Sequence, residues 1–586
     1  MRTPPLNVAV YLERMAAEYP TRVALYVPRQ SVAVDGPTPH QAITFAELNQ
    51  EVDALAHGLA TIGITRGVRT VVMVPPSVEF FTLTFALFKL AAVPVLIDPG
   101  MGIRQLGRCL QEAEPEAFIG IAKAHLARRL FGWARRTVRL TVTVGRWRLG
   151  SQTTLAQLRE RGHAHGPYPV SAVTANEVAA ILFTSGSTGV AKGAVYNHGN
   201  FAAQVQCLKQ TYGIEPGEVD LCTFPLFALF GPALGMTCVI PDMNPTRPAQ
   251  LNPHRALAQI RQFQVTNLFG SPAVIRRLGE LAERDSSRSI SSSDTVPCTS
   301  KPLLATLRRV ISAGAPASIP AIERLVQLLP PGVQVFTPYG ATEALPVSNI
   351  GSQEILTQTR HLTEQGRGVC VGRPVSGIEV HVIPITDTPI AVWDDALELP
   401  VGVIGEFVVR GAVVTQTYFN RPEATELGKI ADPRRGEVLH RMGDVGYRDE
   451  QGRLWFCGRK SHRVETPDGT LFTDMVEPIF NTVPGVVRTA LVGVTRGPRT
   501  IPVLCVEWDR STRWATVEDR LQKRAAAFPH TRDISTFLCY RGTFPVDVRH
   551  NSKIFREKLA RWANRKLGKV WRSELPPLSG AGKERT

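Results

Sequence analysis

Residues 181–193 read ILFTSGSTGVAKG. The apolar run 178–183 predicts a buried strand, after which the chain changes to hydroxyls and glycines. Glycines let backbone N–H groups turn towards an anion, Ser and Thr hydroxyls add donors, and Lys192 supplies a positive charge. The stretch therefore predicts a loop that holds phosphate groups, and a polar loop without a ligand is the alternative. It is not a Walker loop, because the glycine–lysine spacing differs and no Ser or Thr follows the lysine.

Strand and helix patterns alternate along the N-terminal half of the chain. Residues 68–74 and 93–97 predict strands, and the apolar residues 79–92 between them predict a helix. Such alternation favours a mostly parallel sheet covered by helices, which is an α/β fold. Since 586 residues are too many for one hydrophobic core, we expect two or more domains. The serine-rich residues 285–300 lack apolar periodicity, which indicates a flexible surface insertion.

The composition is that of an ordinary globular enzyme, with 44% hydrophobic and 20% charged residues. The formal net charge is +16, and residues 104–148 and 553–585 each hold ten Lys and Arg. No zinc-finger or RNA-binding signature accompanies this charge, so we expect no nucleic-acid partner. We interpret the basic stretches as solvated faces, and contact with a membrane surface or an acyl-carrying protein is the alternative. Residues 125–139 predict an amphipathic surface helix, which we expect to pack on the core.

Nine cysteines are scattered without CxxC spacing, as is typical of a reducing compartment. The N-terminal residues lack the apolar core of a signal peptide. Residues 221–241 carry no charge, but Pro225, Gly231, Pro232 and Gly235 interrupt them. We therefore expect a buried core segment there and not a membrane span, and a cytoplasmic protein as a whole.

A second motif, FTPYGATE, occupies residues 336–343. Tyr339 offers a flat ring on which adenine can stack. Gly340 and Ala341 allow the backbone to approach a ligand closely, Thr342 can donate to a phosphate, and Glu343 supplies an oxygen for Mg²⁺. A strand-end turn without a ligand is the alternative. In a third motif, MGDVGY at 442–447, the aspartate can accept both hydroxyls of a ribose, and an ordinary turn aspartate is the alternative.

These motifs, in this order, resemble those of the adenylate-forming superfamily, which includes acyl-CoA synthetases, luciferases and adenylation domains. The resemblance implies ATP and Mg²⁺ as cofactors and a loop that holds the β- and γ-phosphates. It implies that residues 314–316 line the adenine, that Asp444 binds the ribose, and that Arg459 is a second contact to the ribose or a phosphate. Lys553, within PVDVRHNSKIFR at 545–556, is implied to bridge the substrate carboxylate and the α-phosphate, with a basic surface loop as the alternative.

The resemblance assigns nucleotide-binding roles to Thr184, Ser185, Gly186, Ser187, Thr188, Gly189, Lys192, Gly314, Ala315, Pro316, Tyr339, Gly340, Ala341, Thr342, Glu343, Asp444, Arg459 and Lys553. Of these, Thr184, Glu343 and Lys553 are implied to be catalytic, and Glu343 is implied to bind the metal ion.

The implied fold is a large N-terminal lobe of stacked αβαβα layers with a β-rich subdomain, followed by a small mobile α+β domain. We expect the N-terminal domain to cover residues 1–459 and the C-terminal domain with the catalytic lysine to cover residues 460–575. A flexible tail is expected at residues 576–586.

The chain departs from acyl-CoA synthetases at two places tied to thiol chemistry. Ala228 stands where many of them have histidine, and the hinge, GRKS at 458–461, lacks the usual Asp or Lys in its fourth position. Residues 339–346 and 549–553 resemble a branch of the superfamily that forms β-lactones in long-chain olefin biosynthesis. That branch implies a long-chain 2-alkyl-3-hydroxy acid as substrate and assembly with other hydrocarbon-biosynthesis enzymes. A long-chain fatty acyl-CoA ligase and an inactive scaffold protein of the same fold are the alternatives.

Overall fold

The computed structural model describes residues 6–29, 39–145, 151–184, 191–224, 230–289, 302–497, 499–546 and 553–574. These residues form two compact units. The first unit lies within Met1–Gln358 and Cys370–Leu454, and the second within Thr359–Val369, Trp455–Asp547 and Lys553–Thr586. The change from the first unit to the second falls inside strand β22 (Leu454–Arg459), whereas the functional division after residue 459 stays a prediction.

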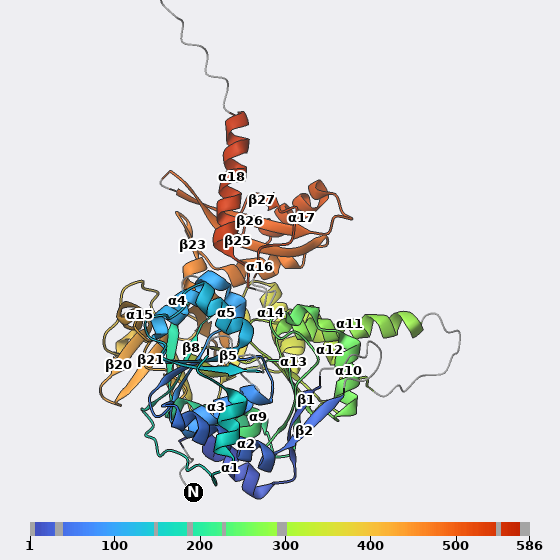
Figure 1. The fold of residues 1–586 in the computed structure, drawn as a ribbon. Coiled ribbons are helices and arrows are strands. Elements are labelled where there is room, and N and C mark those ends of the chain that lie inside the picture. The colour runs from blue at the N-terminus through green and yellow to red at the C-terminus, as the bar shows by residue number, and fades with distance from the viewer. Residues whose placement is uncertain are drawn as a thin grey trace, which may run out of the picture. The chain divides into compact units, whose positions relative to one another are not determined.

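The predicted phosphate loop follows a strand of a seven-stranded sheet in the first unit (Figure 1). Neighbouring strands are parallel except for the last pair, which is an antiparallel hairpin around the loop. From edge to edge the strands are β7 (Thr153–Thr154), β6 (Leu140–Val144), β5 (Ala117–Ile121), β3 (Arg69–Met73), β4 (Val93–Leu96), β8 (Val178–Phe183) and β9 (Gly193–Asn197). The strand predicted at 178–183 is therefore confirmed residue by residue.

A second seven-stranded sheet carries the segments expected to meet adenine. Its pairs are parallel except for β1 with β2. In spatial order the strands are β14 (Val335–Phe336), β13 (Arg309–Ser312), β12 (Asn267–Gly270), β10 (Val219–Cys222), β11 (Thr237–Val239), β1 (Val23–Pro28) and β2 (His40–Thr44).

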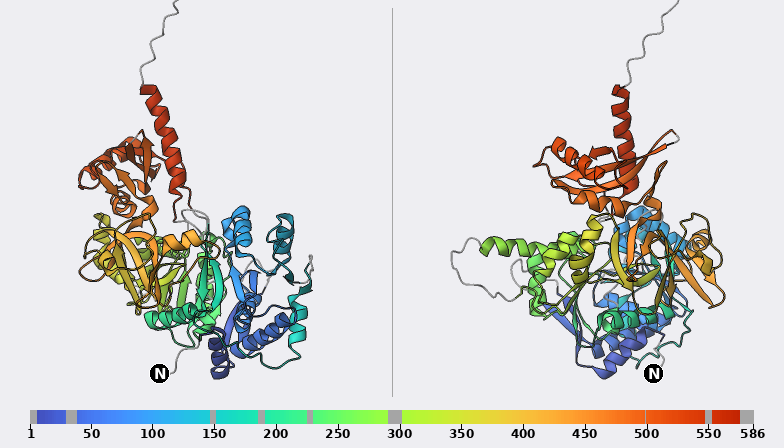
Figure 2. Two further views of the ribbon diagram at one scale, coloured as in Figure 1. Left: turned by 90° about the vertical axis from the view of Figure 1, so that its left-hand side faces the viewer. Right: turned by 180° about the vertical axis from the view of Figure 1, so that it is seen from behind.

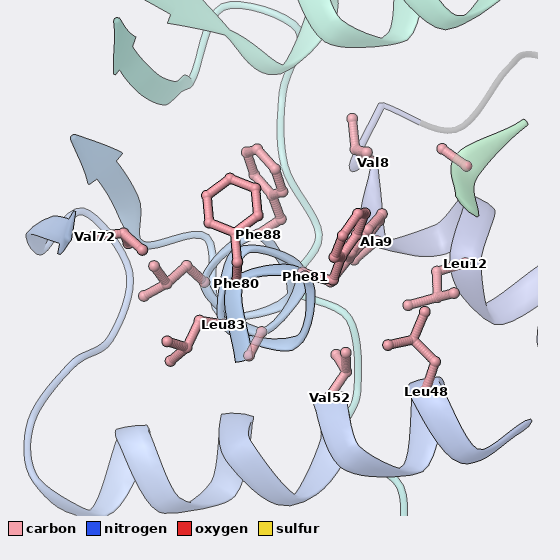
Figure 3. Packing of buried hydrophobic residues seen from close by; sticks show 14 of the residues in the cluster. Val8, Ala9, Leu12, Leu48, Val52, Val72, Phe80, Phe81, Leu83 and Phe88 are labelled. Atoms are coloured by element: carbon pink, nitrogen blue, oxygen red, sulfur yellow. The ribbon is translucent and has the colours of Figure 1, made fainter. Parts of the chain in front are cut away.

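Helix α3 (Val78–Lys89) belongs to one hydrophobic cluster with residues of both sheets. Residues 80–89 are all buried, since a helix that is apolar all round can only lie inside a core. In Figure 3 its phenylalanines leave the helix on different sides: Phe80 and Phe88 lie together, whereas Phe81 faces Ala9 of the N-terminal helix, with α2 below. The buried Lys89 at its end is paired with Asp53 and, at 2.6 Å, with Glu13.

The other helices of the first unit cover the sheets and connect their strands. Helix α2 begins with a capping box, in which the Glu47 N–H donates to Thr44 Oγ1 at 3.2 Å and the Thr44 N–H donates to Glu47 Oε2 at 2.8 Å. These helices are α1 (Ala9–Glu18), α2 (Phe45–Thr61), α4 (Ile103–Ala113), α5 (Ala122–Leu130), α6 (Leu155–Gly162), α7 (His198–Tyr212), α9 (Phe230–Ala233), α10 (Pro253–Gln262), α11 (Pro272–Ser289), α12 (Ile319–Val326), α13 (Ser352–Glu354) and α15 (Pro422–Gly428).

A β-rich part completes the first unit. Here β15 (Tyr339–Ala341), β16 (Ala344–Asn349) and β17 (Val369–Pro374) pair as antiparallel neighbours. A second antiparallel group is formed, in spatial order, by β18 (Ile378–Ile383), β19 (Gly405–Gly411), β21 (Glu437–Arg448) and β20 (Lys429–Asp432). The buried Phe407, Val409 and Met442 belong to the core of this part.

The second unit is smaller and has α+β character. Its sheet is β25 (Val486–Arg496), β26 (Arg499–Trp508) and β27 (Thr536–Cys539), beside the hairpin β23 (Val464–Thr466) and β24 (Gly469–Leu471). Its helices are α14 (Arg360–Glu364), α16 (Thr473–Asn481), α17 (Trp514–Ala526) and α18 (Arg556–Glu574). Leu559, Ala563 and Leu567 recur every four residues and pack α18 on the sheet, beyond which the helix extends (Figure 2). The predicted fold class is confirmed: an α/β lobe with a β-rich part and a smaller α+β unit.

The strands predicted at 68–74 and 93–97 and the helix predicted at 79–92 are found with bounds one to three residues different. Two other predicted segments differ further. The helix predicted at 125–139 begins earlier and ends at Leu130, because Gly132 and Ala134 turn the chain with φ of 64° and 48°. The serine-rich insertion begins later than residue 285, since α11 continues to Ser289, and residues 290–300 lie outside the described residues. Residues 221–241 contribute to β10, α9 and β11, and no described helix is long and apolar enough to cross a membrane.

Most of the cysteines are buried thiols. Eight of the nine lie in the described residues, and seven of these eight are buried, with Cys539 half-buried. Burial raises the pKa of the Cys109 and Cys505 thiols to about 12 and that of the Cys370 thiol to about 11. These cysteines therefore act as small core side chains.

Truncation of a phenylalanine of α3 tests the buried position of this helix. Phe81 is 1% exposed, so Phe81→Ala is expected to lower the free energy of unfolding by about 3–5 kcal/mol. The control Leu427→Ala removes a side chain that is 45% exposed and should change it by less than about 0.5 kcal/mol. Urea unfolding followed by circular dichroism measures both. Equal midpoints for the two variants would contradict the central position of α3.

Candidate active site

The predicted phosphate loop begins and ends at two residues, Thr184 and Lys192, that are hydrogen-bonded to each other. The Thr184 N–H donates to the Lys192 carbonyl oxygen at 3.0 Å, and the Lys192 N–H donates to Thr184 Oγ1 at 3.3 Å. Phe183 lies opposite Gly193 in the β8–β9 register. The predicted residues Ser185, Gly186, Ser187, Thr188 and Gly189 lie outside the described residues, as does Ala228. The hairpin thus fixes the two ends from which the predicted loop departs.

Glu343 lies in the turn between β15 and β16, and neighbours from other segments hold this turn. The Tyr418 hydroxyl donates to Glu343 Oε1 at 2.6 Å. The Thr415 N–H and hydroxyl donate to the Glu343 backbone carbonyl at 2.9 and 3.1 Å. The Tyr196 hydroxyl donates to the Thr342 carbonyl at 2.5 Å. Both the backbone and the carboxylate of Glu343 are therefore oriented.

Tyr418 also connects Glu343 to the phosphate loop. Lys192 Nζ lies 5.0 Å from the centre of the Tyr418 ring, within the range of a cation–π contact. Tyr418 is held there because residues 417–419 pair with β9: the Val195 N–H donates to the Thr417 carbonyl at 3.1 Å, and the Phe419 N–H donates to the Gly193 carbonyl at 2.8 Å. One phenol thus contacts both a lysine and a carboxylate that the sequence assigned to nucleotide binding.

The buried Lys429 contacts both Thr415 and the ring of Tyr418. Lys429 Nζ donates to the Thr415 carbonyl and, at 3.1 Å, to Thr415 Oγ1, and it lies 5.7 Å from the centre of the Tyr418 ring. Burial lowers the pKa of Lys429 to about 7, against the opposing attraction of the Glu343 carboxylate. The side chain therefore braces the segment that orients Glu343.

No sequence motif singled out Thr415, Tyr418 or Lys429 as functional residues. One signal was available: Lys429 begins an otherwise apolar stretch, Lys-Ile-Ala, and a lysine in such a place needs partners. The contact between Tyr418 and Glu343 spans 75 residues of sequence, and no local pattern marks it.

Two of the residues expected to meet adenosine, Tyr339 and Asp444, lie side by side. The Tyr339 hydroxyl donates to Asp444 Oδ2 at 2.6 Å, and the Tyr339 ring lies edge-on to Phe407 with centroids 6.1 Å apart. Asp444 is 2% exposed and follows Gly443, which has a left-handed φ of 64°. The structure thus brings together a ring and a carboxylate from the second and third predicted motifs.

The segment Gly314-Ala315-Pro316 follows β13, and Tyr339 follows the neighbouring strand β14. These strands are parallel, so both segments leave the same edge of the sheet. Carboxyl ends of parallel strands are the usual place for ligands in α/β folds. Gly314 turns there with φ of 93°, a conformation that favours glycine.

The remaining predicted residues, Arg459 and Lys553, belong to the second unit. Lys553 precedes a β-bridge between Val546 and Ile554, and the Phe555 N–H donates to the Pro545 carbonyl at 2.8 Å. The next residue, Arg556, forms a two-pronged ion pair with the buried Glu477, of which one contact measures 3.0 Å.

The Glu477 carboxylate also anchors this segment to the sheet of the second unit. Its Oε1 accepts the Leu491 N–H at 2.8 Å. Burial raises the pKa of Glu477, and the guanidinium of Arg556 opposes that rise. Lys553 therefore lies three residues before Arg556, which the ion pair with Glu477 fixes within the second unit.

Comparison with known proteins identifies the family of the chain. A family model described as "AMP-binding enzyme" matches residues 12–419, which include the phosphate loop, Tyr339, Glu343 and Tyr418. An olefin beta-lactone synthetase of Stenotrophomonas maltophilia (strain K279a) is 50% identical over 571 residues, covering 96% of this chain and 99% of that protein. An olefin beta-lactone synthetase of Xanthomonas campestris pv. campestris is 48% identical over 563 residues, covering 95% and 97%.

Among solved structures, the amide bond synthetase McbA from Marinactinospora thermotolerans has a TM-score of 0.73 with this chain at 21% identity, covering 95% of this chain and 99% of that one. This similarity shows the adenylate-forming fold. The family match and the two relatives make the protein an ATP-dependent, AMP-forming enzyme of the ligase type. The chain belongs to the AMP-binding enzyme family and, within it, to the family of the olefin beta-lactone synthetases.

Proposed function

We propose that the chain converts a long-chain 2-alkyl-3-hydroxy acid into a β-lactone, as a step of long-chain olefin biosynthesis. In the first step a carboxylate oxygen of the acid attacks the α-phosphorus of ATP, and pyrophosphate leaves. In the second step the β-hydroxyl oxygen attacks the acyl carbon and loses its proton, and AMP leaves. The names of the two relatives near 50% identity support this assignment. The enzyme would contribute near-attack geometry, since both reacting groups of the second step belong to one molecule.

One observation carries the nucleotide part of the proposal: Lys192 and Glu343 contact the same phenol, that of Tyr418. A point charge on a lysine suits phosphate oxygens, and an oriented carboxylate suits a hard divalent cation. The pair therefore fits a triphosphate that carries a divalent ion. Thr184, at the start of the loop, would donate its hydroxyl to the same phosphates.

The donor set around Glu343 fits Mg²⁺. Among the described residues, no group of three His, Cys, Asp or Glu side chains could enclose a metal ion. Mg²⁺ usually keeps water and phosphate ligands and takes only one or two carboxylates, so a single oriented carboxylate is sufficient. When bound, the ion would lower the negative charge of the phosphates and of the departing pyrophosphate. Glu343 is proposed as its protein ligand, and Tyr418 as the residue that orients Glu343.

The adenosine part would be held by groups from two motifs. Tyr339 would stack on the adenine, while the backbone of residues 314–316 would line it. Asp444 would accept the ribose hydroxyls, with Arg459 as a second contact. Gly340 and Ala341 would let the backbone approach the α-phosphate, and the Thr342 hydroxyl would donate to it.

Lys553 is proposed as the residue that stabilises the transition state of the first step. Its ammonium would bridge the attacking carboxylate and the α-phosphate, where negative charge accumulates. This assignment makes residues 460–575 the proposed domain that carries the catalytic lysine. A cytoplasmic location is proposed with it, because the described cysteines are thiols. Assembly with other hydrocarbon-biosynthesis enzymes is also proposed.

Product analysis without a thiol tests the proposed reaction. The protein is incubated with Mg·ATP and a synthetic long-chain 2-alkyl-3-hydroxy acid, in the absence of CoA, and the products are identified by NMR. A β-lactone and AMP in equal amounts are expected. An adenylate that persists and becomes a thioester only when CoA is added would assign the protein to the long-chain acyl-CoA ligases. If no acid supported pyrophosphate release, the protein would be assigned to the third alternative, an inactive scaffold protein of the same fold.

Replacement of the proposed catalytic lysine separates catalysis from nucleotide binding. Lys553→Ala is expected to lower the rate of pyrophosphate release by at least about 10²–10³-fold, the usual cost of removing one group that stabilises transition-state charge. ATP binding, measured by calorimetry, should remain detectable. Lys558→Ala, which removes an exposed lysine of α18, is the matched control and should retain the wild-type rate. A normal rate in Lys553→Ala would refute the role.

Removal of the Tyr418 hydroxyl tests how Glu343 is oriented. Tyr418→Phe keeps the ring beside Lys192 but removes the donor to Glu343 Oε1. The Mg²⁺ concentration that gives half-maximal pyrophosphate release is expected to rise by about tenfold or more, as for other outer partners of metal ligands. Tyr26→Phe, in β1, is the control and should leave this concentration unchanged. An unchanged Mg²⁺ dependence in Tyr418→Phe would show that Glu343 does not need this bond.

A further inference from the structure

Four large apolar side chains are exposed on two neighbouring helices of the first unit. They are Leu126 and Leu130 of α5, Phe131 directly after it, and Ile103 of α4. Their exposed fractions are 57%, 73%, 46% and 54%, respectively, and Leu130 is the most exposed large hydrophobic residue in the described part of the chain. We call these four residues and the cations around them the α4–α5 patch. Figure 1 shows α4 and α5 next to each other.

The helix α5 is fixed with its apolar residues outward. Its inner face carries His125, which is fully buried, and whose Nε2 is 2.9 Å from the Val142 carbonyl. The His125 ring also lies edge-on to Phe118, and the Arg128 guanidinium lies 5.5 Å from the centre of the same Phe118 ring. A helix anchored by this face cannot turn Leu126 and Leu130 into the core.

The two helices are also joined to each other. Phe131 stacks on Trp133, with ring centroids 5.6 Å apart and an angle of 24° between the planes. Trp133 is buried against α4 so closely that a Cβ placed on Gly107 would lie 2.9 Å from its Nε1. Leu106 and Leu110 of α4 share a hydrophobic cluster with Trp133. The patch therefore has a fixed shape and is not a frayed end.

The surroundings of the apolar residues are strongly basic. The exposed cations on α4, on α5 and in the turn after it are Arg104, Arg108, Lys123, Arg129, Arg135 and Arg136. Of the acidic residues in the same stretch, Glu112 is paired with Arg421 at 2.7 Å and Glu116 with Arg69 at 3.2 Å. Glu114 is exposed, and the Glu116 side chain remains 43% exposed in its ion pair. The exposed cations of this stretch therefore outnumber the acidic side chains that reach the solvent.

We propose that the α4–α5 patch docks on an anionic lipid bilayer. Exposed leucine and phenylalanine on a helix that also presents Lys and Arg are the pattern by which helices enter the boundary between lipid headgroups and acyl chains. The cations would lie at the level of the lipid phosphates, which supplies the charge complementarity. The docking does not depend on the reaction proposed above. If that reaction is also correct, the patch would keep the enzyme where a long-chain acid accumulates.

Vesicle co-sedimentation tests the proposal with the full-length protein. One set of vesicles is pure phosphatidylcholine, and the other contains phosphatidylcholine and phosphatidylglycerol in equal amounts. Wild-type protein is expected to sediment with the anionic vesicles and only weakly with the neutral ones. The double variant Leu126→Asp/Leu130→Asp should lose about tenfold or more of the bound fraction, since it places two carboxylates in the proposed contact. Salt should weaken the wild-type binding, because screening acts on the cations.

The control variant is Val401→Asp, which adds a carboxylate at another exposed apolar position of the first unit, 52% exposed. It should sediment like the wild type. Circular dichroism verifies that both variants are folded. Pyrophosphate release should be unchanged in both, because none of the changed residues belongs to the proposed active site. Equal vesicle binding by the double variant, or no binding of wild-type protein to anionic vesicles, would overturn the proposal. If the double variant lost binding to an acidic protein but kept its vesicle binding, the patch would be assigned to a protein partner. That result would overturn the proposal as well.

Discussion

The hydrogen bond from the Tyr418 hydroxyl to the Glu343 carboxylate is the contact on which the predicted nucleotide site depends. It joins a turn of the β-rich part to a segment that pairs with β9, the strand that closes the phosphate loop. Because Lys192 lies over the same ring, a shift of residues 417–419 would displace the lysine and the carboxylate together. Cation and anion are thus held in one geometry by backbone pairing and not by contact with each other. Such preorganisation is what electrostatic catalysis requires.

The arrangement around Tyr418 requires that the charged side chain of Lys429 be buried, which costs free energy. Removing an ammonium from water is unfavourable, and burial accordingly shifts its pKa to about 7. The oxygens of Thr415 and the face of the Tyr418 ring replace part of the lost hydration. A neutral apolar side chain of similar length would cost less free energy to bury, but it would not donate a hydrogen bond to the Thr415 carbonyl. The lysine is therefore best understood as a support for the segment that contacts Glu343.

The sequence predicted the strand before the phosphate loop, the apolar helix between the sheets and the α/β class, because each has a strong local period. It also selected Tyr339 and Asp444, which the structure joins by a hydrogen bond across 105 residues. It could not find Tyr418 or Lys429, because their importance comes from contacts between distant segments. It also extended α5 past Leu130, since an amphipathic pattern continues after the backbone turns at Gly132. Helical periodicity records which side chains are apolar, whereas the turn depends on a backbone conformation that periodicity does not encode.

The burial of the cysteines has a consequence for following the molecule in solution. A thiol reagent attacks the thiolate, and a thiol that is both buried and raised in pKa offers almost none to the solvent. Labelling of Cys109 in the first unit or Cys505 in the second therefore requires that unit to open. The rate of modification at each position thus records the opening of one unit at a time. The native cysteines Cys109 and Cys505 can therefore report separately on the opening of the first and the second unit.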